Sequence, residues 1–165
     1  GGLVLTIFYP FCKRFIKSPQ VILGLTFSWS IPMAYVACGS EFNLSMFFLW
    51  VGVLIWIVVY DTFYALVDID DDLKTGVFST AILFGDKVSF VTSLSQITVL
   101  VLWAYLGTIL EMSLIYFLML IIVLLLFSRQ QLLISTRQKK DCFRAFNESW
   151  YVGFFHFLGI FLSLS

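Results

Sequence analysis

Charge is scarce in this sequence. Of its 165 residues only 12% are Asp, Glu, Lys or Arg, whereas 61% are hydrophobic, and the mean hydropathy is +0.99. Soluble globular domains carry about 25% charged residues, so this composition excludes that class. We predict instead an all-α protein, a polytopic transmembrane helical bundle.

Cysteine and histidine are also few. Cys12, Cys38 and Cys142 are far apart and show neither the spacing of metal ligands nor that of a redox motif, so we interpret them as packing residues. His156, the only histidine, stands in an apolar stretch between two phenylalanines. We expect it to be packed rather than to bind a ligand.

An initiating methionine, a basic leading segment and a cleavage site are absent at the N-terminus. The opening apolar run is therefore not expected to be a signal peptide. Residues 1–11 are too few to cross a bilayer core of about 30 Å, and we interpret them as the end of a helix that starts upstream. We accordingly expect residues 1–165 to be the C-terminal part of one longer transmembrane domain.

Further apolar stretches predict five spans, the last of marginal length. They cover residues 20–38, 44–66, 88–106, 113–128 and 149–165, and the fourth can be extended to residue 134. Gly24 and Pro32 interrupt the first of them, and neighbouring helices tolerate such breaks at membrane depth.

Basic residues are confined to three of the connecting segments. All ten Lys and Arg lie within residues 12–19, 67–87 and 129–148, and none lies in the turns at 39–43 and 107–112. Because basic residues mark cytoplasmic loops, the three segments are predicted to be cytoplasmic loops. The C-terminus is then on the opposite side of the membrane.

Half of the acidic residues, five of ten, lie between Asp61 and Asp72. Residues 67–87 are assigned to a polar loop, but we also consider a helix that runs on through the cluster. With an advance of about 100° per residue, such a helix places Asp61, Tyr64, Asp68 and Asp72 on one face. Asp70 then points the other way.

Carboxylates this close repel one another unless a cation lies between them. Magnesium suits them, because it binds carboxylate oxygens and completes its shell with water and substrate phosphates. We therefore predict a Mg²⁺–diphosphate site with Asp68 and Asp72 as ligands. The alternative is a solvated acidic loop. A calcium-binding loop is rejected, since Leu73 and Ser79 stand where its Gly and its bidentate Glu belong.

Other polar residues near the cluster are weaker candidates. Asp61 lies inside an apolar helix, where an ionisable side chain usually faces a cavity. Lys74, Ser79 and Thr80 follow the cluster, within reach of a metal-bound phosphate, although alone they are ordinary loop residues. Lys13 and Arg14 are either membrane-end anchors or anion ligands, and the basic segment at 129–148 is interpreted as an orientation signal facing lipid.

At this point the sequence resembles a known family. The run from Tyr60 to Gly85 is similar to the second aspartate-rich motif of the UbiA prenyltransferases. At the positions compared it reads YDTxYAxVDxDDDxKxGxxSTAILFG. Shorter runs extend the resemblance over essentially the whole chain, at residues 9–14, 29–34, 142–146 and 151–153.

The resemblance implies a single domain of nine spans, of which this chain holds the last five to six. The family's first aspartate-rich motif, Asn-Asp-x-x-Asp-x-x-x-Asp, is absent from the chain. We therefore expect the chain alone to be inactive. The members it resembles most transfer a polyprenyl group from polyprenyl diphosphate to 4-hydroxybenzoate in ubiquinone biosynthesis, with Mg²⁺, in the bacterial inner membrane.

By the same resemblance Asp68, Asp72 and Asp61 are expected to be catalytic. Arg14 is the candidate for the acceptor carboxylate and Lys13 for phosphate or carboxylate. The substrate-binding set is completed by Tyr64, Lys74, Ser79 and Thr80.

Two alternatives stay open. One is another member of the superfamily that acts on a menaquinone, haem O or chlorophyll precursor, against which the run Trp29–Ala34 argues. The other is a cation-coupled membrane carrier, although the internal repeat common in carriers is not seen. Besides the lipid bilayer and the substrates we expect no nucleic-acid partner.

Overall fold

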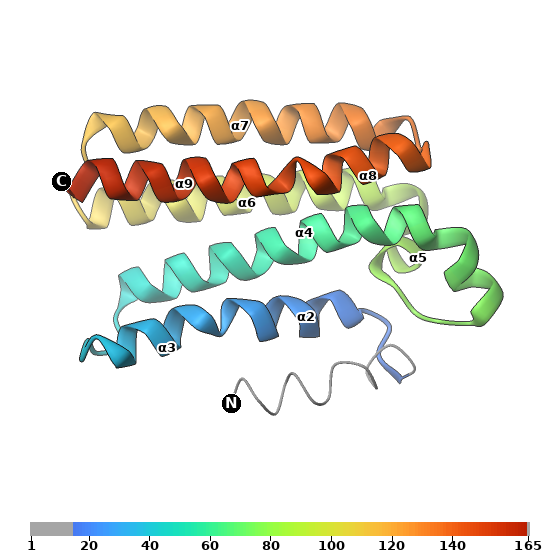
Figure 1. The fold of residues 1–165 in the computed structure, drawn as a ribbon, viewed down its shortest axis with the longest axis horizontal. Helices are drawn as coiled ribbons and strands as arrows, with labels where there is room; N and C mark the ends of the chain where they lie inside the picture. Colours follow the sequence, from blue (N-terminus) through green and yellow to red (C-terminus); the bar gives the residue numbers. More distant parts are fainter. Residues whose placement is uncertain (1–14, 165) are drawn as a thin grey trace.

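The computed structural model describes residues 15–164, and their regular elements are all helices (Figure 1). In chain order these are α2 (Pro19–Ser28), α3 (Ser30–Ala37), α4 (Leu44–Thr75), α5 (Thr80–Phe84), the 3-10 helix η1 (Gly85–Lys87), α6 (Val88–Ile109), α7 (Leu114–Ser135), α8 (Lys139–Asn147) and α9 (Ser149–Leu164). The expected all-helical class is confirmed.

Four segments in the described part of the chain are long and apolar enough to cross a membrane. They cover Pro19–Ala37, Leu44–Thr75, Thr80–Ile109 and Leu114–Ser135, which confirms the first four predicted spans. The fifth, at residues 149–165, corresponds to α9. Its 16 residues rise only about 24 Å at about 1.5 Å per residue, and this agrees with its predicted marginal length.

The first span breaks where α2 ends and α3 begins, at Trp29. Pro32 then falls in the first turn of α3, where a missing N–H costs no hydrogen bond. The predicted interruption at Gly24 is wrong, because α2 continues through it. Gly24 instead lets α2 approach α4: a Cβ there would lie 2.8 Å from Cγ2 of Val58.

The assignment of residues 67–87 and 129–148 to loops is wrong for most of their length. Residues 67–75 belong to α4, 80–84 form α5 and 139–147 form α8, whereas 129–135 complete α7, which confirms the extension of the fourth span to residue 134. A change in hydropathy marks where a helix leaves lipid, not where it ends, and Asp, Lys, Gln and Arg are all compatible with a solvated helix. α8 is amphipathic and buries Cys142 and Ala145.

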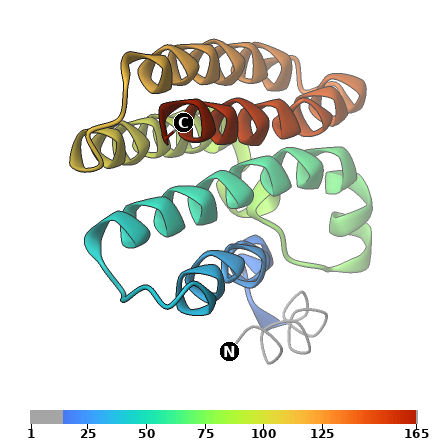
Figure 2. The same cartoon turned by 60° about the vertical axis from the view of Figure 1, so that its left-hand side comes forward.

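The helix α4 is the centre of the arrangement. It contacts α2, α6 and α8, and Figures 1 and 2 place α2 and α3 on one side of it and α6, α7 and α9 on the other. Asn43 caps its start by accepting a hydrogen bond from the Met46 N–H at 2.8 Å. Its end is at Gly76, whose φ of 68° is left-handed and therefore favours glycine.

Hydrogen-bonded glutamines join the helices beyond α4. Gln96 of α6 donates to the Oε1 of Gln130 on α7 at 2.9 Å, and Gln130 donates to Oγ of Ser149 at 3.1 Å, where α9 begins. All three side chains are buried. Because buried amides are costly to leave unpaired, this chain of bonds fixes the corner between α8 and α9 against α6 and α7.

His156 is packed, as expected. It is buried, stacks on Trp103 with ring centroids 3.6 Å apart, and its Nε2 lies 3.2 Å from the Tyr116 hydroxyl. That hydroxyl donates to the Trp103 carbonyl at 2.8 Å. The cluster ties α6, α7 and α9 together.

Candidate functional site

The acidic cluster lies on the last turns of α4. The helix runs unbroken from Leu44 to Thr75, so the supposition that it continues through the cluster is confirmed. Its helical period therefore puts Asp61, Tyr64, Asp68 and Asp72 on one face. We call this set the acidic face.

Burial separates the acidic face from the other aspartates. Asp61, Asp68 and Asp72 are half-buried, whereas Asp70 and Asp71 are exposed. In the described part of the chain, no three His, Cys, Asp or Glu side chains gather closely enough to hold a metal ion by themselves. The two predicted ligands, Asp68 and Asp72, would therefore need water or substrate oxygens to complete the coordination of a cation.

Lysines pair with the two exposed aspartates. Lys139 Nζ at the start of α8 lies 2.9 Å from Asp70 Oδ2, and Lys74 Nζ lies 3.1 Å from Asp71 Oδ1. The hydrogen bond and the charge of Asp70, with weaker effects of Asp71 and Asp68, raise the pKa of Lys139. Lys139 is therefore held charged beside the acidic end of α4.

Two further predicted site residues, Ser79 and Thr80, are buried at the start of α5. Ser79 caps that helix by accepting from the Ile82 N–H at 3.4 Å. The Thr80 hydroxyl lies 2.8 Å from the Thr62 hydroxyl of α4, and the Thr80 N–H donates to Gln20 Oε1 of α2 at 2.9 Å. Their polar groups hold α5 to α4 and α2. Lys13 and Arg14 lie outside the described residues.

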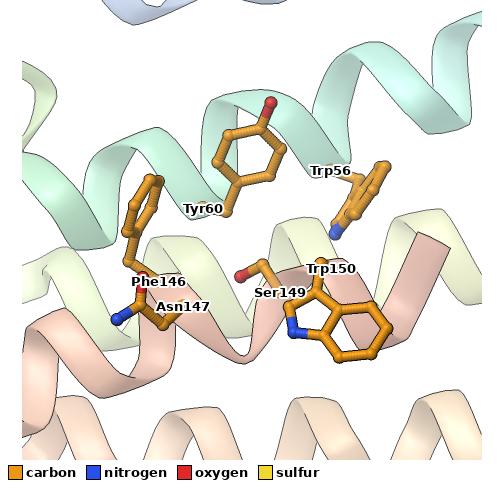
Figure 3. Close-up of a pocket in the computed structure, with 6 residues that line it drawn as sticks. All are labelled: Trp56, Tyr60, Phe146, Asn147, Ser149 and Trp150. Atoms are coloured by element: carbon orange, nitrogen blue, oxygen red, sulfur yellow. The ribbon is translucent and has the colours of Figure 1, made fainter. Parts of the chain in front are cut away.

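An aromatic pocket of about 360 Å³ opens beside the acidic face (Figure 3). Trp56 and Tyr60 line it from α4, and the opposite wall comes from the corner of α8 and α9. That wall is formed by Phe146, Asn147, Ser149 and Trp150. Trp56, Tyr60 and Tyr64 follow one another at four-residue spacing, and so these aromatic side chains form a row along α4 that leads from the pocket towards Asp68.

Phe146 connects the pocket to the acidic face. Its ring centroid lies 6.0 Å from that of Tyr60 and 5.1 Å from that of Tyr64. Sequence reasoning missed Phe146, Trp56 and Tyr60 as site residues. The spacing of Trp56, Tyr60 and Tyr64 was an available signal, whereas the contact with α8 was not visible in the sequence.

Ion pairs stabilise the corner between α8 and α9 that forms the wall of the pocket. Glu148, between α8 and α9, accepts from Arg129 Nε at 2.7 Å and from Arg144 Nε at 2.8 Å. These two hydrogen bonds hold the pKa of Glu148 below its usual range, and the bond from Arg129 has the larger effect. The carboxylate therefore stays ionised between two guanidinium groups.

Residues 1–159 match a family model described as the UbiA prenyltransferase family. The chain belongs to this family. Among the curated UbiA relatives, the 4-hydroxybenzoate octaprenyltransferase of Psychromonas ingrahamii is 48% identical over 98% of this chain and 56% of its own length. That of Edwardsiella ictaluri is 47% identical over 99% of this chain and 57% of its own length. The chain thus spans about half the length of the relatives it matches.

Solved structures support the same fold. The apo structure of a UbiA homolog from Aeropyrum pernix K1 matches with a TM-score of 0.82 at 20% identity, over 99% of this chain and 62% of that one. A structure described as digeranylgeranylglyceryl phosphate synthase matches with a TM-score of 0.78 at 17% identity, over 98% and 61%. The UbiA resemblance and the multi-pass membrane fold expected from the sequence are confirmed.

Proposed function

We propose that this chain supplies the diphosphate-binding helix of an enzyme that transfers a polyprenyl group from polyprenyl diphosphate to the ring of 4-hydroxybenzoate. One observation carries the proposal: the half-buried carboxylates of Asp68 and Asp72 lie on the same helix as Trp56 and Tyr60 of the aromatic pocket, about two and three turns beyond Tyr60. The curated relatives named 4-hydroxybenzoate octaprenyltransferase support this donor and acceptor.

The paired carboxylates fit magnesium. Mg²⁺ is commonly bound through one or two carboxylates together with substrate phosphates and water, and Asp68 and Asp72, one turn apart, offer two. Magnesium bound there would neutralise the charge that develops on the diphosphate as it leaves.

The pocket accounts for the apolar part of the donor. In this proposal the first isoprene units lie against Trp56, Tyr60 and Phe146, with the diphosphate at the acidic face. The bond between the allylic carbon and the diphosphate oxygen breaks, and its electron pair leaves with the diphosphate. The apolar walls exclude water from the allylic cation. The ring carbon ortho to the hydroxyl then attacks, and its proton leaves.

The remaining polar residues receive roles within the same scheme. Asp61, between the pocket and Asp68 along α4, is proposed to support the metal site or the ring hydroxyl. Arg14 is proposed to bind the acceptor carboxylate and Lys13 the phosphate or the carboxylate. Lys74, Ser79 and Thr80 stay as predicted phosphate ligands, and Ser79 and Thr80 would act from within the hydrogen bonds described above.

We further propose a location and an orientation. The protein lies in a bacterial inner membrane, with the acidic end of α4 and the basic segments at 12–19, 67–87 and 129–148 on the cytoplasmic side and the C-terminus in the periplasm. The distribution of all ten Lys and Arg supports this orientation.

The testing experiment measures transfer to radiolabelled 4-hydroxybenzoate in membranes that contain the full-length gene product. Polyprenyl diphosphate is the donor, and magnesium is either present or chelated. We expect a labelled lipid only with magnesium. Preference for a naphthoate or a haem acceptor over 4-hydroxybenzoate would reject the acceptor, and the absence of any product from folded, inserted protein would reject the reaction.

A further inference from the structure

The acidic end of α4, which we call the extension (residues 67–75), is less buried than the rest of the helix, although Val67 and Ile69 still pack against the core. The last buried side chain of this helix is Leu66, and residues 67–75 are half-buried or exposed. Asp68 and Asp72 both belong to this extension. Hydrophobic packing alone therefore fixes their position less firmly than it fixes the rest of α4.

An ion pair reaches the extension from another helix. Lys139, the first residue of α8, lies with Nζ 2.9 Å from Asp70 Oδ2. The ion pair between Lys74 and Asp71 is made within α4 and so cannot hold the helix to its surroundings. The ion pair of Lys139 therefore joins the extension to α8.

The partner of Lys139 lies opposite the acidic face. Two residues along an α-helix turn the side chain by about 200°, so Asp70 lies nearly opposite Asp68 and also opposite Asp72. Because the backbone here is one continuous helix, a contact that fixes the rotation of Asp70 also fixes the direction of both proposed ligands. Lys139 thus contacts α4 on the side opposite Asp68 and Asp72.

We propose that Lys139 is a positioning residue for the diphosphate site: its ion pair with Asp70 ties the end of α4 to α8 and keeps Asp68 and Asp72 turned towards the donor diphosphate. This inference rests on the proposed function. It assigns a role in the reaction to the segment at 129–148, which the sequence presented only as an orientation signal.

The expected effect is modest. The side chains of Lys139 and Asp70 are 51% and 60% exposed, and exposed ion pairs typically change an equilibrium by about two- to fivefold. An effect of this size on donor binding, without an effect on acceptor binding, identifies a residue that orients the diphosphate ligands.

The experiment uses the full-length enzyme in lipid nanodiscs with three variants: Lys139→Gln, the matched control Lys140→Gln, and the charge swap Asp70→Lys with Lys139→Asp. Lys140→Gln removes the same charge from the next position, and Lys140 forms no ion pair with a described residue. Half-saturating concentrations of farnesyl diphosphate, 4-hydroxybenzoate and magnesium are measured. Amide hydrogen exchange of residues 67–75 is recorded without substrates.

We expect Lys139→Gln to raise the half-saturating concentrations of farnesyl diphosphate and magnesium about two- to fivefold. That of 4-hydroxybenzoate should stay unchanged, and exchange at residues 67–75 should become faster. Lys140→Gln should resemble the wild type, and the charge swap should recover most of the loss. Unchanged constants in Lys139→Gln, an equal change for donor and acceptor, or no recovery in the swap would overturn the inference.

Asp68→Asn, measured in the same assay, separates the two proposals. If it retains full transfer, the proposed metal site is wrong whatever Lys139 does. If it abolishes transfer while Lys139→Gln behaves as the wild type, the proposed function stands and only the role of Lys139 is rejected.

Discussion

The rings of Tyr64 and Phe146 lie 5.1 Å apart, centroid to centroid, and join the acidic face of α4 to the wall of the aromatic pocket. Tyr64 comes from the helix that carries the proposed metal ligands, and Phe146 comes from the end of α8. One contact thus brings together the part of the site suited to a diphosphate and the part suited to an isoprenoid chain.

Loss of either proposed metal ligand should nearly abolish transfer in the full-length enzyme. Asp68→Asn and Asp72→Asn each remove one charge from the site, and we expect kcat to fall about 100-fold or more, or about 3 kcal/mol of transition-state stabilisation. Asp71→Asn is the matched control, because Asp71 is exposed and pairs with Lys74. Near-normal turnover of both variants at limiting magnesium would contradict the metal role.

Truncation of Phe146 should weaken binding of the prenyl donor. In the proposal Phe146 covers the first isoprene units, and the loss of about 55 Å² of buried apolar surface at about 25 cal/mol per Å² should raise the half-saturating concentration of farnesyl diphosphate about tenfold in Phe146→Ala. Phe143→Ala provides the comparison: this residue is on the same helix but is 45% exposed and does not line the pocket. An equal effect of both substitutions would place the donor elsewhere.

Thr80 should be needed for stability. Thr80→Val removes the hydroxyl that lies 2.8 Å from that of Thr62 inside the protein, and a lost buried hydrogen bond costs about 1 kcal/mol. We expect a lower melting temperature of the detergent-solubilised full-length protein. Thr80→Ser keeps the hydroxyl and should restore most of the loss. If Thr80→Val melts like the wild type, the hydrogen bond between α4 and α5 does not contribute to stability.

Glu148 should stabilise the fold in a pH-dependent way. Arg129 and Arg144 lower its pKa in the folded state, whereas the pKa of a Glu carboxyl in an unfolded chain is about 4.3. The stabilisation is therefore fully present above that pH and is lost as the pH falls through the lower folded pKa.

Glu148→Gln should accordingly lower the melting temperature at neutral pH, and its difference from the wild type should shrink below a pH of about 4. Glu41→Gln, at an exposed turn, should show no such trend. A difference for Glu148→Gln that stays constant with pH would show that the ion pairs contribute nothing.

The predictable parts of the molecule were those governed by local pattern. Apolar length located four spans, and the helical period placed Asp61, Tyr64, Asp68 and Asp72 on one face, because both depend only on neighbouring residues. Hydropathy placed the end of α4 too early, since a helix that has left the bilayer continues in water until a residue such as Gly76 ends it.

Contacts between helices could not be predicted in this way. Nothing near Asp70 in the sequence points to Lys139, and nothing near Thr80 points to Gln20, because these pairs arise only when α8 and α2 pack beside α4. The aromatic pocket was missed for the same reason: each wall is an ordinary aromatic stretch until the two are brought together.

From the length of α4 we expect the protein to respond to the thickness of its membrane. Its 32 residues rise about 48 Å, well beyond a hydrocarbon core of about 30 Å. A helix without a break behaves as a rod, so lipids with longer acyl chains, which draw its apolar part deeper or tilt it, shift the carboxylates at its end by the same movement. We therefore expect the acyl-chain length of the surrounding lipid to change how far the carboxylates lie from the hydrocarbon core.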